Sequence, residues 1–283
     1  MGAQRFIFSK QGESYELLNV AEIVGFGMPP VSHAMRGRGW RRDGGSVQHV
    51  RFEPRPFTIV FDTTGASYAA AAAAHRSIMR FFADKGGRKL EYVRYDGRRL
   101  YLYPVYLASE SEPSLDEISI INDTMQFVAE NPYFMRDIAY VSATLETPLF
   151  EYPEAGLEIP AGGIEFSRAE SELSIVNDGD IEGDTLIRFV GAADNPFVEN
   201  ITTGQKIEVD RTMISTDVLE INSAAGTVEI VAGDGSRSNA FNYITEASAF
   251  IKLARGTNQI QFGSSGGSGY LAIGGVEYYA TAV

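Results

Sequence analysis

Few residues of this chain are of the types that do covalent or metal chemistry, and their spacing does not favour it. The sequence contains no cysteine and three histidines, His33, His49 and His75. The absence of cysteine excludes disulfides, thiolate catalysis and zinc fingers. No histidine is followed by a second histidine two or four residues later, as a sequence-local zinc site would require. The sequence therefore predicts no metal and no cofactor, and we expect His75 to be a packed or surface imidazole.

The carboxylates are numerous but do not form a catalytic pattern. In the stretch 206–210 the acids alternate with apolar residues, which places them on the wet face of a strand. The loop 177–184 resembles a calcium-binding loop, yet it lacks the twelve-residue spacing and the terminal bidentate glutamate. The sequence also has no Gly-x-Ser-x-Gly elbow and no phosphate-binding loop. These observations predict that the chain has no catalytic residues.

Charge is distributed unequally along the chain. Residues 1–140 hold 17 basic and 16 acidic residues, and residues 141–283 hold 7 and 21. The first part therefore has a net charge of +1 and the second of −14, which together give the net charge of −13. An acidic surface repels nucleic acid, so no nucleic-acid binding is predicted. No apolar run is long enough to span a membrane, and the N-terminus lacks the order of a signal peptide, which predicts synthesis in the cytoplasm.

The first half mixes strands with a helix. Alternation in 51–61 predicts a strand, and six consecutive alanines, 69–74, predict a helix within 65–87. Thr63 or Thr64 could cap this helix, and Gly86 and Gly87 could end it. A hairpin spanning 90–107 is predicted around Asp96 and Gly97. Both of its faces carry large residues, so it is either an internal core strand pair or a ribbon whose second face meets another copy.

The second half reads as β-structure. Short alternating segments separated by glycine-containing turns recur through residues 163–283, including 239–245 and a hairpin in 248–262. The predicted fold class is an α+β N-terminal domain, β-rich with one main helix, followed by an all-β sandwich or jelly roll. The predicted boundaries are 1–140 for the first domain, 141–162 for a proline-containing linker and 163–283 for the sandwich.

A basic segment, 36–45, combines four arginines with the single tryptophan of the chain. Its glycines predict a long loop between strands, and arginine and tryptophan are enriched at the centres of protein interfaces. A nucleic-acid contact and a merely solvated loop are the alternatives. Together with the hairpin tyrosines, the segment supplies the predicted interface residues Arg36, Arg38, Trp40, Arg41, Arg42, Tyr92, Tyr95, Tyr101 and Tyr103.

Two stretches of the chain resemble a known family. Pro29-Pro30, Asp43-Gly44 and Pro54-Arg55-Pro56-Phe57, followed by the helix, the hairpin and 131–134, occur in the order found in siphophage distal tail proteins. Near the C-terminus, Leu253, Gly256, Asn258, Ile260 and Phe262 resemble a turn and outgoing strand of the same family. The resemblance extends from about residue 5 to the C-terminus, and residues 141–235 match by pattern only.

The resemblance implies a structural role in a virion. The N-terminal domains would close into a homo-oligomeric ring, commonly a hexamer, at the distal end of the tail tube. The C-terminal domain would be a galectin-like sandwich. The expected partners are copies of the chain, the tail tube protein, the tape measure protein and the tail-tip or receptor-binding proteins. The expected location is the tail tip, without a membrane.

The sequence is also compatible with two other functions, sugar binding and glycan hydrolysis. A galectin-like sandwich could bind sugar through surface aromatic residues, and the candidate contacts are Tyr243, Tyr270, Tyr278 and Tyr279, with Phe241 nearby in sequence. Core packing is the alternative role for each of them. A glycan hydrolase would need two carboxylates that converge in a cleft, which the sequence does not display. The fold of the sandwich alone does not transfer either function.

Overall fold

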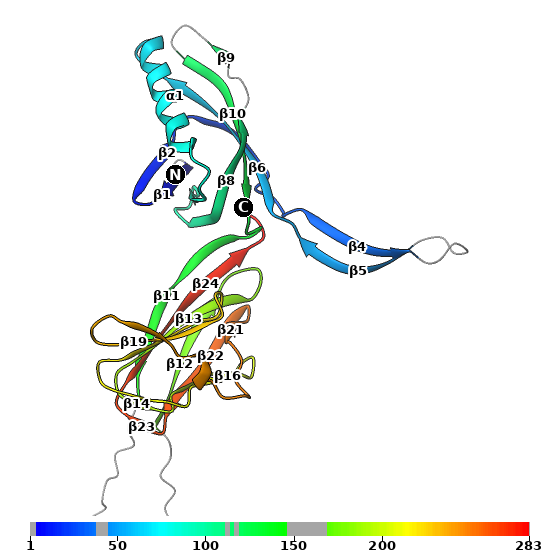
Figure 1. The fold of residues 1–283 in the computed structure, drawn as a ribbon. Helices are drawn as coiled ribbons and strands as arrows, with labels where there is room; N and C mark the ends of the chain where they lie inside the picture. Colours follow the sequence, from blue (N-terminus) through cyan, green and yellow to red (C-terminus); the bar gives the residue numbers. More distant parts are fainter. Residues whose placement is uncertain (1–3, 38–44, 111–113, 116–118, 146–168, 283) are drawn as a thin grey trace, which may run out of the picture. The chain divides into compact units, whose positions relative to one another are not determined.

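The computed structural model describes residues 4–37, 45–110, 114–115, 119–145 and 169–282 (Figure 1). Most of these residues lie in β-strands, and the described chain contains one α-helix, so the predicted β-rich fold is confirmed. Contacts divide the chain into two compact units. The first comprises Met1–Arg136 with Tyr279–Val283, and the second comprises Asp137–Tyr278.

The first unit is built from antiparallel strands and one helix. Its elements are β1 (Arg5–Lys10), β2 (Glu13–Leu17), β3 (Val20–Val24), β4 (Val31–Gly37), β5 (Gly45–Phe52), β6 (Arg55–Thr64), α1 (Tyr68–Phe82), β7 (Arg88–Val93), β8 (Arg99–Glu110), β9 (Ser114–Leu115), β10 (Ser119–Ala129) and the start of β11 (Phe134–Thr144). The strands pair in the order β2-β1-β7-β8-β10-β6-β3. β4 and β5 pair with each other as a separate two-stranded ribbon (Figure 1).

Aromatic side chains fill the core of the first unit. Every second residue of β6 and β10 is buried, as expected of strands with one face on a core. Phe127 of β10 lies at the centre, stacked on Phe8 at 5.0 Å and on Phe57 at 5.1 Å between ring centroids. Phe82 of α1 packs edge-on against Phe8, which anchors the C-terminal end of the helix to the sheet. Each such aromatic pair adds about 0.5–1.5 kcal/mol beyond its buried area.

The helix α1 lies within the predicted range, but its ends differ from the prediction. Ser67, and not Thr63 or Thr64, is the N-cap, and its hydroxyl accepts a hydrogen bond from the Ala70 amide. Both threonines are already the last residues of β6 and pair with β10, so they are not free to cap. At the other end, Ala83 in an ordinary helical conformation closes the helix. Gly86 and Gly87 follow the helix and do not supply its last residue.

The hairpin predicted around Asp96 and Gly97 is present as β7 and β8. Gly97 has a φ of 82°, the conformation that favours glycine in a tight turn. β7 lies between β1 and β8, so both of its edges are paired. Leu90, Tyr92 and Val93 are buried, in agreement with the internal-strand alternative for this segment.

The second unit contains two main sheets. Its elements are the rest of β11, β12 (Ala169–Asn177), β13 (Gly183–Val190), β14 (Ala193–Asp194), β15 (Phe197–Asn200), β16 (Gln205–Glu208), β17 (Thr212–Met213), β18 (Val218–Asn222), β19 (Thr227–Val231), β20 (Arg237–Asn239), the short 3-10 helix Phe241–Tyr243, β21 (Lys252–Leu253), β22 (Gly256–Ser264), β23 (Gly266–Gly267) and β24 (Tyr270–Tyr279). One sheet includes β24-β13-β18-β19-β20, and the other is β12-β22-β15-β16. Phe189 of the first sheet contacts Phe262 of the second, within one shared core.

Two predicted strand segments of this unit are wrong. Residues 239–245 contain the 3-10 helix instead of a strand. The hairpin in 248–262 is absent because β21 pairs with β13 while β22 pairs with β12 and β15. Local alternation resembles a hairpin at this point, but the chain here crosses from one sheet to the other.

Buried polar side chains hold this crossing in addition to the short pairing of β21 with β13. Four successive carbonyl oxygens, those of residues 251–254, each accept a hydrogen bond from a buried side chain. The donors are Thr185, Asn200, Asn177 and Asn258 in that order, at 2.7–2.9 Å. Asn258 also accepts from the Ala254 amide, so it closes the turn from both sides. Because buried carbonyls must be paired, these side chains determine where the crossing occurs.

Candidate interaction surfaces

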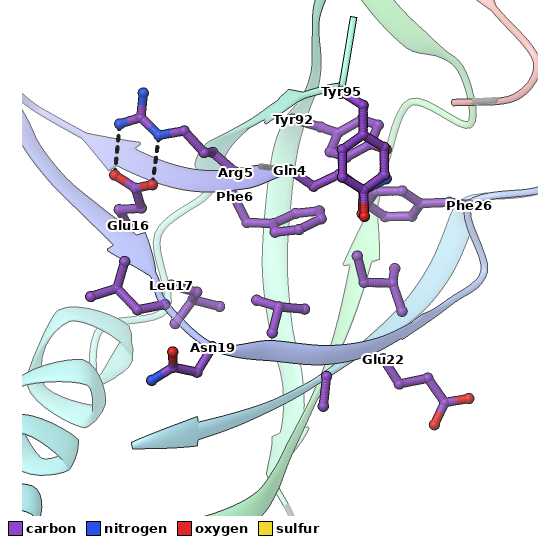
Figure 2. A pocket seen from close by; sticks show the side chains of 14 residues that line it. Gln4, Arg5, Phe6, Glu16, Leu17, Asn19, Glu22, Phe26, Tyr92 and Tyr95 are labelled. Carbon is purple, nitrogen blue, oxygen red and sulfur yellow. Dashed lines mark hydrogen bonds and ion pairs between the residues drawn. The ribbon is translucent and has the colours of Figure 1, made fainter. Parts of the chain in front are cut away.

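An open groove of about 720 Å³ lies between two strand edges of the first unit (Figure 2). It is bordered by β1 and β2 on one side and by β3 on the other. Within the described residues, β2 pairs only with β1 and β3 pairs only with β6, so the two strands face each other across the groove without pairing. A free strand edge carries unpaired amide and carbonyl groups that can pair with another chain.

Aromatic rings form the apolar lining of this groove. Phe6 and Tyr92 stack with centroids 5.1 Å apart, and Phe26 packs edge-on against Tyr92 at 5.4 Å. Gln4 donates a hydrogen bond of 2.7 Å to the Tyr92 hydroxyl, and burial raises the pKa of that phenol. This hydroxyl therefore holds Gln4 against the wall of the groove.

The rim of the groove is polar with exposed apolar residues. Arg5 donates from two nitrogens to Glu16 at 2.7 Å each, and this pair lowers the pKa of the Glu16 carboxyl (Figure 2). Leu18 is 65% exposed, and Tyr95 is 59% exposed. An apolar centre with a polar rim is the composition of a protein contact surface. The lining offers no nucleophile with an adjacent base.

A second surface follows the ribbon of β4 and β5. Large apolar residues are exposed along this segment and on its approach from β3: Val24, Met28, Val31, Val50 and Phe52. Phe52 contacts Tyr133 at 5.5 Å and so ties the base of the ribbon to the rest of the unit. A two-stranded ribbon is at best marginally stable in water without something to pack on. The sequence pattern pointed to the arginines of this segment and did not indicate these exposed apolar residues.

The structure separates the predicted interface residues. Tyr92 is buried in the core of the first unit and its ring lines the groove, so its role in an interface stays a prediction. Tyr95 and Tyr103 are exposed, and Tyr101 is half-buried beneath Lys89. Arg36 belongs to β4, while Arg38, Trp40, Arg41 and Arg42 lie outside the described residues.

The candidate sugar-contact residues lie in different environments. Tyr279 is buried in the core of the first unit, so it is not a surface aromatic of the sandwich. Tyr278 is half-buried and donates a hydrogen bond of 2.6 Å to Asp184; burial, followed by this bond, raises its pKa. Tyr270 begins β24, so about eight strand residues, or roughly 26 Å, separate it from Tyr278. Tyr243 is exposed and lies beneath the Arg211 guanidinium.

The first unit thus presents two open surfaces, the groove and the ribbon, with aromatic and apolar side chains. Surfaces of this composition are typical of proteins that contact other proteins. Comparison with known proteins shows what the chain resembles. Residues 178–273 match the model of the siphovirus-type tail component, C-terminal domain, which confirms the resemblance seen in the sequence.

Solved structures with the same fold cover nearly the whole chain. One is the Dit (gp 19.1) protein of SPP1, described as a paradigm of the hub adsorption apparatus in phages that infect Gram-positive bacteria. It is 12% identical, with a TM-score of 0.63 over 96% of this chain and 98% of that chain. Chains of the phage p2 baseplate in its activated conformation, with Sr or Ca, give TM-scores of 0.52 and 0.53 at 12% and 11% identity, with the same coverage. No curated protein matches the sequence.

Proposed function

We propose that this chain is a structural component of a siphovirus-type phage tail that forms a ring at the distal end of the tail tube. The ring would join the tube to the host-recognition tip. The observation that carries this proposal is the full-length fold similarity to the SPP1 hub protein, together with the family match of residues 178–273. The proposed location is the tail tip of the virion. No helix among the described residues is long and apolar enough to cross a membrane.

The two units would have different roles in the tail. We assign ring formation to the N-terminal domain, 1–140, and outward projection to the galectin-like sandwich, 163–283, joined by the linker 141–162. The near-neutral charge of residues 1–140 supports this assignment, because copies of that domain can approach without large repulsion. The acidic second half would keep neighbouring sandwiches apart.

The ribbon of β4 and β5 is the proposed joint between neighbouring copies. A ring requires a heterologous contact, in which one patch of a subunit meets a different patch of the next. The ribbon pairs only with itself among the described residues and exposes Val31, Val50 and Phe52. Packing against the next copy would bury these side chains at about 25 cal/mol for each Å² of apolar area. The arginines and the tryptophan of 38–44, which follow β4 in the sequence and lie outside the described residues, would add interface anchors.

The tail-tube, tape-measure and receptor-binding proteins are the further partners that this role requires. The groove between β2 and β3 is a second open surface available to them. The role requires shape and strand pairing, and we assign no catalytic step to the chain. The structural neighbours are themselves tail and baseplate components.

The test is the molar mass of the purified full chain, measured by light scattering after size-exclusion chromatography. The proposal predicts a discrete oligomer, with six copies as the expected number, at micromolar protein. A monomer of 30.9 kDa at every concentration tested would contradict it.

A further inference from the structure

A charged residue occupies a core-facing position in the first unit. In β10, inward positions recur at every second residue, and Met125, Phe127 and Ala129 fill three of them. The next inward position along this series is Asp123, which is fully buried. A strand irregularity between Ile120 and Asp123 sets this register, with Asn122 at a φ of 53°. Bulges often redirect a side chain next to a functional site.

Two further metal-ligating side chains meet this carboxylate. His75 belongs to the face of α1 that carries the buried residues Ala71, Ile78 and Phe82, and its Nε2 lies 2.9 Å from Asp123 Oδ2. Glu110, at the end of β8, places Oε1 3.7 Å from the same nitrogen. One donor atom from each of the three residues lies within 4.8 Å of the others. A helix, a strand end and a bulge therefore converge on one point.

The cluster leaves polar groups without partners. Asp123 Oδ1 is buried and has no hydrogen-bond partner in the structure, and neither does the buried hydroxyl of Thr63. Strand register places Thr63 on the same inward face, two residues from Phe61, which pairs with Asp123. An orphaned buried carboxylate oxygen is costly and calls for an unseen water or ion. The imidazole is the only group with a cationic form that the described contacts place against this carboxylate.

We propose that His75, Glu110 and Asp123 bind a divalent first-row transition-metal cation, of which Zn²⁺ is the representative. Zinc takes histidine nitrogen and carboxylate oxygen at about 2.0–2.2 Å, which sets tetrahedral ligand atoms roughly 3.3–3.6 Å apart. The observed separations of 2.9 and 3.7 Å bracket this spacing. Water would complete the coordination, since Glu110 lies at the exposed side of the cluster.

The donor set determines which cations fit. An imidazole nitrogen suits zinc and related transition metals, whereas calcium and magnesium take oxygen ligands. Burial, and secondarily the Asp123 charge, raises the pKa of Glu110, and burial raises that of Asp123. A bound cation would offset the repulsion between the Glu110 and Asp123 carboxylates. It would also connect α1 to β8 and β10. The proposal concerns binding within the first unit and is independent of ring formation.

The experiment is a titration of the chelator-treated full chain with zinc chloride, followed by calorimetry and by the melting temperature. We expect one zinc per chain at micromolar zinc and a saturable rise in melting temperature. His75→Ala and Glu110→Gln should each raise the dissociation constant for zinc by about tenfold or more. Cobalt(II) substitution should give visible absorption bands that both variants lose.

The matched control is His33→Ala, because His33 is an exposed histidine on β4. It should bind zinc as the unaltered chain does. The Glu110→Gln variant keeps the test valid if His75→Ala fails to fold, since Glu110 lies at a strand end on the surface. Absence of saturable zinc binding, equal affinity in His75→Ala, or stabilisation by calcium but not by zinc would overturn the proposal.

Discussion

The Arg55 side chain donates a hydrogen bond of 2.7 Å from Nη2 to the carbonyl oxygen of Ala280, 225 residues further along the chain. The same guanidinium donates to the carbonyls of Gly25, Gly27 and Pro132. It also lies 4.8 Å from the centre of the Phe134 ring. Arg55 is fully buried, and burial lowers its pKa to about 10, so it remains charged near neutral pH. One side chain thus joins two loops, at 25–27 and at 132, and the C-terminal segment.

Arg55→Ala is predicted to destabilise the first unit by about 3 kcal/mol, because several buried carbonyls lose their donor at once. The loss of stability in Arg55→Lys should lie between zero and that of Arg55→Ala. A lysine ammonium keeps the charge but lacks the planar guanidinium that donates to several carbonyls at once. Urea unfolding followed by circular dichroism measures both. Arg51→Ala is the control: Arg51 is exposed and paired only at the surface, so its change should stay within about 0.5 kcal/mol. Equal effects of the Arg51 and Arg55 variants would refute the assignment.

Asn258→Ala is predicted to loosen the crossing between the two sheets of the second unit. The variant leaves the Ala254 amide and carbonyl without their side-chain partner, which costs about 2 kcal/mol. In the variant, amide hydrogen exchange should be faster than in the unaltered chain at residues 251–258, with a smaller change in the rest of the unit. Gln259→Ala, on the exposed face of the same strand, is the control. Unchanged exchange at 251–258 in the Asn258 variant would argue against this role.

The pH dependence of stability is predicted to change in Asp123→Asn. Burial raises the folded pKa of Asp123 above its unfolded value of about 3.9. The stabilising contribution of this group is therefore complete below about pH 4 and is lost as pH rises through the folded pKa. In the presence of chelator, the variant should gain melting temperature relative to the unaltered chain between pH 4 and pH 7. A difference that stays constant across this range would be inconsistent with a raised pKa.

Val50→Asp is predicted to abolish oligomer formation without unfolding the chain. Val50 is 60% exposed on β5, so a charge there costs the isolated chain little but would be buried in the proposed ring contact. Mass photometry gives the oligomer, and the melting temperature checks the fold. Val176→Asp, at an exposed apolar position of β12, is the matched control and should still assemble. An oligomer that survives Val50→Asp would exclude the ribbon as the joint.

Local patterns predicted much of this fold. Alternation located β6 and short strands of the second half, the alanine run located α1, and Asp96 with Gly97 located the hairpin of β7 and β8. The failures occur where partners distant in sequence decide the outcome. Apolar and polar residues alternate in 248–262 as they would in a hairpin. However, Thr185, Asn177 and Asn200 donate hydrogen bonds to carbonyls of this segment, and its two strands belong to different sheets.

The surfaces were harder to predict than the strands. Tyr92 and Tyr279 are large aromatic residues in alternating segments, and only tertiary contacts place both in the core of the first unit. The His75 cluster draws one residue from a helix and two from separate strands, so no sequence spacing indicates it. A usable indication was present in β10, where Asp123 interrupts a series of apolar inward residues.

Negative-stain electron microscopy of the purified full chain tests the central claim most directly. We expect closed rings of a single copy number in the class averages, and we expect the ring to be lost in Val50→Asp. Isolated particles of single-chain size at all concentrations, or open filaments with no closure, would contradict the claim that the chain acts as a ring-forming tail component.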